Sequence, residues 1–158
     1  MIKAYGNIMS DTIFQLIPDQ PAYVPDEETA SLAEQFLRSH LPGASEVYAE
    51  VSEEIRFIDA GANYESVSCP ICGKEIANEW WLAAMDEAYE SQFNNLDIVV
   101  PCCGSKASLN NLDYHSPQGF ARFVLSARNP DIQGLDGQAM QELEMIVGSK
   151  LRAIVSHY

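Results

Sequence analysis

The chemistry available to this sequence is concentrated in its cysteines. They form two local pairs, one with two intervening residues and one adjacent: Cys69, Cys72, Cys102 and Cys103. Pro70 and Gly73 favour a tight turn around the first pair, in which backbone N–H groups can point at thiolates. We expect no secretory signal, because no basic segment precedes an apolar one at the start, and local pairs then favour metal over disulfides. Four thiolates suit a tetrahedral zinc ion in a closed site.

The adjacent pair sets a geometric condition on that site. Cys102 and Cys103 would point to opposite faces of an extended strand, so both can reach one metal only where the backbone turns. Pro101 and Gly104 flank the pair and favour such a turn. If the backbone does not turn, one cysteine is buried as a small apolar residue and His115 is the alternative ligand.

The element C-P-I-C-G at residues 69–73 resembles the first knuckle of zinc-ribbon and zinc-knuckle proteins. The resemblance covers residues 69–104 at most, and it implies a structural Zn²⁺ held by the four cysteines. A standard ribbon has a second C-x2-C where this chain has adjacent cysteines, so the match is to the first knuckle. The whole module, with Y-H-S-P-Q-G at residues 114–119, is also similar to a small bacterial family of unassigned role.

Two enzymatic alternatives stand beside the structural site. A C-x2-C is the active site of a thiol-disulfide oxidoreductase when its first cysteine begins a helix, which lowers the thiol pKa. Here the next helix is expected only from Asn78, and the second pair would have no role. A zinc ion with three cysteine ligands and a water would leave an open position for catalysis. The sequence has no serine nucleophile elbow, phosphate-binding glycine loop or H-E-x-x-H motif.

Two arginines offer a further site. Arg122 and Arg128 lie six residues apart on one strand-like segment, and period-two counting places them on the same side. They either pair with nearby carboxylates or bind an anionic ligand.

The charge of the chain is regional. Its 158 residues have a formal net charge of −14, and residues 1–100 hold 18 acids and 4 bases whereas residues 101–158 hold 5 of each. Nucleic acids and anionic membranes are excluded as partners, because phosphates are held chiefly by Lys and Arg. We expect a cytoplasmic, non-enzymatic protein whose partner has a basic surface, for example an immunity or antitoxin-like protein that covers a basic toxin.

Hydrophobic periodicity predicts an α+β fold. Strands are expected over residues 13–17, 47–51, 55–58, 98–100, 120–125 and 151–155. The second and third of these read as a hairpin around residues 52–54. Helices are expected after an Asp26 cap, from an Asn78 cap to Phe93, and over residues 136–147 before Gly148.

Strand, helix and strand occur once over residues 12–60 and again over residues 120–156. Two such halves predict a ferredoxin-like sandwich, a sheet with two helices on one face. A zinc-ribbon-like module, residues 61–118, is then inserted between them in a single domain over residues 12–158, after a mobile leader of residues 1–11. The alternative is an α+β domain built around the metal-centred unit itself.

Overall fold

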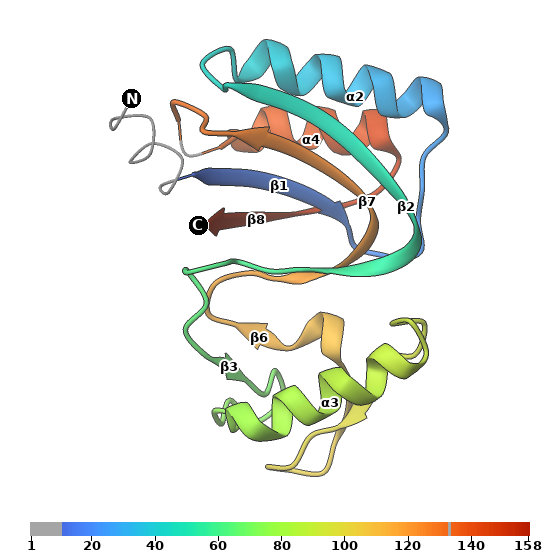
Figure 1. Cartoon of the computed structure of the whole chain (residues 1–158), viewed down its shortest axis with the longest axis vertical. Helices are drawn as coiled ribbons and strands as arrows, with labels where there is room; N and C mark the ends of the chain where they lie inside the picture. Colours follow the sequence, from blue (N-terminus) through green and yellow to red (C-terminus); the bar gives the residue numbers. More distant parts are fainter. Residues whose placement is uncertain (1–10, 133) are drawn as a thin grey trace, which may run out of the picture.

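The largest sheet has four antiparallel strands in the order β2-β7-β1-β8. The computed structural model describes residues 11–132 and 134–158 of the chain (Figure 1). The strands are β1 (Thr12–Pro18), β2 (Glu46–Ile58), β7 (Gly119–Arg128) and β8 (Leu151–His157). β7 is buried along nearly its whole length, because it is a central strand with apolar side chains on both faces. The expected α+β class is confirmed at the level of a mixed fold with an antiparallel sheet.

Two helices lie side by side on one face of this sheet (Figure 1). α2 (Glu27–His40) connects β1 to β2, and α4 (Gly137–Val147) connects β7 to β8. Both begin where expected, because Asp26 and Asp136 accept hydrogen bonds from backbone N–H groups three residues on, at 2.7 and 2.8 Å. Between the helices and the sheet lies a buried core that includes Phe14, Leu16, Leu37, Phe123, Leu125, Leu143 and Val147.

The hairpin predicted over residues 47–58 is wrong, because this segment is the single strand β2, paired with β7 from end to end. The polar residues in the middle of β2 form a β-bulge, where the register of pairing with β7 shifts between Val51 and Arg56. Ser52 closes this bulge by donating its hydroxyl to the Glu54 carbonyl at 2.6 Å. The polar residues 52–54 favour a turn locally, but pairing with β7 on both sides of them keeps β2 a single strand.

The residues between β2 and β7 form a second lobe below the sheet, here called the cysteine module (residues 61–118; Figure 1). β3 (Val67–Ser68) pairs with β6 (Asp113–Tyr114), and β4 (Asp97–Val99) pairs with β5 (Lys106–Ser108). The module also holds α3 (Asn78–Glu90) and a 3-10 turn, η1 (Leu109–Asn111), and with α2 and α4 this makes three α-helices in the described residues.

Helix α3 differs from the prediction at both ends. Ala77, not Asn78, is its N-cap and supplies no side-chain hydrogen bond. The helix ends at Glu90, because Gln92 and Phe93 adopt left-handed backbone conformations with φ of 58° and 61°.

Aromatic rings join the module to the sheet. Phe120 of β7 packs against Phe57 of β2 and Phe93 of the module, with ring centroids 5.1 Å apart in each pair. Phe57 also lies 5.8 Å from Trp81 of α3. The core of the module is therefore continuous with the end of the large sheet.

A half-buried arginine adds polar contacts at the same junction. Arg152 of β8 donates to the carbonyl oxygens of Asn110 and Gln118, both at 2.8 Å. Asn110 in turn accepts from the backbone N–H of Phe120 at 3.1 Å. Burial lowers the pKa of Arg152 from its ordinary value, and these acceptors stabilise its charge.

Replacing Arg152 with methionine is expected to lower the free energy of unfolding by about 2–3 kcal/mol, because two carbonyl oxygens lose a charged donor. Arg56→Met is the matched control. Its ion pair with Glu50 is exposed and 3.9 Å long, so we expect a loss below about 1 kcal/mol. Urea unfolding followed by tryptophan fluorescence measures both variants, and equal losses would contradict the role of Arg152.

The leader predicted over residues 1–11 lies outside the described residues except for Asp11, whose carboxylate pairs with Arg128 at 2.6 Å. In residues 11–132 and 134–158, no helix is both long enough and apolar enough to cross a membrane.

Candidate metal centre

The first cysteine pair lies in a tight turn directly after β3. The backbone N–H of Gly73 donates to the Cys69 carbonyl at 3.0 Å, and the N–H of Cys69 donates to the Lys74 carbonyl at 2.8 Å. Gly73 has a φ of +79°, a conformation that residues with a side chain rarely adopt. The glycine predicted to let the chain bend therefore does so.

The second pair lies at the tip of the β4–β5 hairpin. The N–H of Val100 donates to the Ser105 carbonyl and the N–H of Gly104 donates to the Val100 carbonyl, both at 3.0 Å. Gly104 is left-handed, with a φ of +71°. Because the backbone turns here, Cys102 and Cys103 do not point to opposite faces of a strand, and the condition for both to reach one metal is met.

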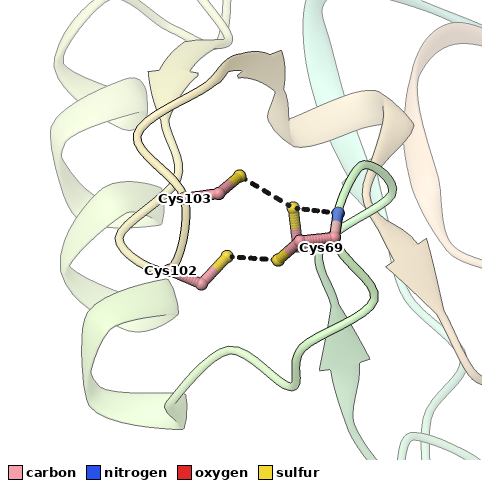
Figure 2. Close-up of side chains that lie close together, drawn as sticks. Cys69, Cys102 and Cys103 are labelled. Carbon is pink, nitrogen blue, oxygen red and sulfur yellow. Dashed lines mark hydrogen bonds between the residues drawn. The ribbon is translucent and has the colours of Figure 1, made fainter.

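The four sulfur atoms converge between these two turns. All lie within 4.8 Å of one another, with Cys72 Sγ 3.2 Å from Cys102 Sγ and Cys69 Sγ 3.9 Å from Cys103 Sγ. Figure 2 shows Cys102 and Cys103 extending from one loop toward Cys69 on the facing loop. A tetrahedron with metal–sulfur bonds of about 2.3 Å has sulfur–sulfur edges of about 3.8 Å. The cysteines are free rather than disulfide-bonded and could hold one metal ion.

The surroundings of the sulfurs shift the pKa values of the thiols in different directions. The backbone N–H of Cys72 contributes most to lowering the pKa of Cys69 to about 6, and the N–H of Ile71 adds to this effect. Hydrogen bonding to Cys72, and then burial, raises the pKa of Cys102 to about 12. The Ser105 hydroxyl lowers the pKa of Cys103. Without a cation the cluster therefore keeps some protons, which a bound divalent ion would displace.

Exposure differs across the site. Cys69 is buried, Cys102 is half-buried, and Cys72 and Cys103 are exposed. The buried side of the cluster adjoins the core of the module, which includes Cys69. An ion here would lie at the surface and tie the two turns together.

His115 takes no part in the cluster. Its Nδ1 hydrogen-bonds to the Ser66 hydroxyl, and its Nε2 hydrogen-bonds to the Ser68 hydroxyl at 3.1 Å. Among the described residues, the group of close metal-binding side chains consists of the four cysteines without this histidine. Both ring nitrogens of His115 therefore hydrogen-bond at the β3–β6 pair rather than in the cysteine cluster.

The two arginines singled out in the sequence have separate partners. Arg128 forms ion pairs with Asp11 at 2.6 Å and Glu46 at 3.3 Å. These contacts match the first of the two alternatives, an arginine paired with nearby carboxylates. Arg122 instead donates to the Ser52 carbonyl at 2.9 Å and supports the bulge in β2.

Ser105 is a residue of the site that the sequence reading missed. Its hydroxyl lies 3.3 Å from the Cys103 sulfur, and its carbonyl closes the hairpin turn. Its position could have indicated this role, because a serine two residues after a cysteine in a tight turn can hydrogen-bond to the cysteine sulfur.

Comparison of the chain with protein-family models, with curated proteins and with solved structures gave no match. The features of the chain that bear on its function are the cysteine cluster, the fold around it and the distribution of charge.

Proposed function

We propose that this chain is a non-enzymatic protein-binding module whose cysteine module is stabilised by one structural Zn²⁺. The observation that carries the proposal is the convergence of four free sulfurs within 4.8 Å from two separate turns. Cys69, Cys72, Cys102 and Cys103 would hold the ion. Four thiolates fill a tetrahedral shell, so the site is closed and its contribution is folding energy.

Zinc suits the donor set better than Mg²⁺, Ca²⁺ or an iron–sulfur cluster. Tetrahedral thiolate sites select zinc or iron, whereas oxygen-seeking Mg²⁺ and Ca²⁺ prefer carboxylates. Sulfur–sulfur distances of 3.2 Å for Cys72–Cys102 and 3.9 Å for Cys69–Cys103 suit a single ion better than a cluster of several iron and sulfide ions. Free thiols also suit a reducing compartment such as the cytoplasm.

The proposed architecture is a ferredoxin-like sandwich over residues 12–158 with residues 61–118 inserted as a zinc-ribbon-like module. Support comes from the strand order β2-β7-β1-β8 and from helices α2 and α4, each joining the two strands of one half. The C-P-I-C-G turn and the β4–β5 hairpin supply the two cysteine pairs.

The thiol-disulfide oxidoreductase alternative has weaker support. Its first cysteine would need to begin a helix, but α3 starts only at Asn78, after the turn and β-bridge that follow Cys69. An open zinc site is likewise disfavoured, because a fourth sulfur lies where a water would bind.

The purified chain is expected to carry one equivalent of zinc, and X-ray absorption is expected to show four sulfur ligands at about 2.3 Å. Cys103→Ser should lose one sulfur from the shell, while His115→Ala, the matched control, should keep all four. Three sulfurs and an oxygen in the unaltered chain would favour the catalytic alternative. A reversible disulfide without bound metal would favour the oxidoreductase.

A further inference from the structure

A groove of about 960 Å³ lies on the cysteine module between helix α3 and the β4–β5 hairpin. Its apolar lining includes Trp80, Ala84, Ala88, Ile98 and Leu109. It is separate from the sulfur cluster, which lies at the tip of the same hairpin. Neither the cysteine site nor the sheet accounts for this surface.

The charged residues of the groove are mostly acidic. Glu87 and Glu90 come from α3 and Asp97 from β4, and Lys106 of β5 is the single basic residue in the lining. Within the described part of the chain, none of these four side chains forms an ion pair. The three carboxylates belong to a stretch of residues 75–97 with six acids and no base. A groove with acidic edges and apolar walls concentrates negative potential and attracts cations.

Trp80 gives the groove an aromatic wall. Neighbouring residues on a helix point about 100° apart, so Trp81 is buried in the core while Trp80 stays half-buried along the groove. An indole face beside carboxylates attracts Lys and Arg side chains through cation–π and ionic contacts together.

The far wall of the groove adjoins the proposed metal site. β4 and β5 have three residues each, and among the described residues they pair only with one another. Their shared turn carries Cys102 and Cys103, so a metal ion would tie this short hairpin to the turn at Cys69 and Cys72. Loss of the ion would remove this link and leave the hairpin held by its packing against the core of the module.

We infer that this groove binds a basic segment of a partner protein, with one apolar side chain on the groove floor and Lys or Arg side chains against the carboxylates and Trp80. The inference rests on the proposed zinc-stabilised binding module and identifies its binding surface. Charge complementarity selects this occupant, because an acidic peptide or a nucleic acid would place like charges against Glu87, Glu90 and Asp97.

The test uses the full, zinc-loaded chain and three short labelled peptides: alternating lysine and leucine, alternating glutamate and leucine, and alternating lysine and serine. The first is expected to bind about tenfold more tightly than either of the others, and more weakly at high salt. Amide resonances of α3 and of residues 97–99 and 106–107 should shift on binding.

Two double variants with the same change in net charge locate the site. Glu87→Lys with Asp97→Lys is expected to weaken binding of the lysine–leucine peptide by about tenfold or more. Glu53→Lys with Glu142→Lys reverses exposed acids of β2 and α4, and we expect a change below about threefold. Equal weakening by both pairs, or resonance shifts outside the groove, would overturn the inference.

Metal analysis of each preparation separates this inference from the proposed function. A metal-loaded chain with four sulfur ligands and no groove-specific binding would overturn the groove and leave the zinc site standing. Groove-specific binding by a chain that takes up no metal would overturn the zinc site and support the groove.

Discussion

Chelation of the proposed metal ion is expected to unfold the cysteine module while most of the four-stranded sheet keeps its structure. The strands of the module have two or three residues each, too few for independent stability. Apparent binding free energies of structural zinc are about 10–16 kcal/mol in small domains, and that energy is lost with the ion. Hydrogen exchange should show amides of residues 69–108 losing protection, while those of α2 and the middle of β7 keep it.

Substitutions of the ligands should follow their burial. Cys69→Ser is expected to be more damaging than Cys103→Ser, because the buried Cys69 sulfur accepts two backbone N–H groups at 3.4 and 3.5 Å whereas Cys103 is exposed. His115→Ala, which leaves the four sulfurs in place, is the control for metal content. Unchanged protection after complete metal removal would show that the module is stable without an ion.

Phe120→Ala is expected to lower the free energy of unfolding by about 3–5 kcal/mol, because it opens a cavity where the sheet meets the module. Phe120 is 0% exposed, and its ring packs against Phe57 and Phe93. Because Phe120 belongs to β7, the loss should appear in probes of both lobes. Differential scanning calorimetry and urea unfolding measure it.

Met145→Ala is the matched control for this cavity. Met145 is 83% exposed on α4, so its truncation should change stability by less than about 0.5 kcal/mol. A loss below about 1 kcal/mol for Phe120→Ala would mean that the aromatic contacts do not couple the two lobes.

Elements with strong local signals could be predicted from the sequence. Asp26 and Asp136 cap their helices with short hydrogen bonds, and Gly148 ends α4 with a φ of +85°. The strands around residues 13–17, 120–125 and 151–155 were expected from apolar runs, and they form the large sheet. In each case residues within one or two turns determine the outcome.

Elements set by distant partners could not be read in the same way. Val67 pairs with Tyr114, a residue 47 positions away, so no local pattern marks the short strands β3 and β6. The polar segment around Ser52 resembled a hairpin turn until pairing with β7 made β2 continuous. Tertiary contacts overrode local propensity in both places.

The features of the candidate site also fall into those set by local sequence and those set by distant partners. Residue types and spacing predicted that the four cysteines form one site, and Pro101 and Gly104 favoured the turn that this site requires, with His115 as the alternative ligand. The hydrogen bonds of His115 with two serine hydroxyls, and of Arg122 with the Ser52 carbonyl, join segments that are 47 or more residues apart in the sequence. The groove beside α3 joins a helix face to a hairpin that the sequence predicted only as one strand.

The cysteine module leaves the large sheet at Ile58 and returns at Gly119, and these two residues are paired neighbours on β2 and β7. During folding this pairing closes a long loop, whose conformational entropy slows formation of the correct register. A module already compact around the proposed ion would bring the strand ends together, so that the loop to be closed would be as short as that of a hairpin. Metal supply during synthesis would then set how long β7, buried in the finished protein, stays unpaired and open to aggregation.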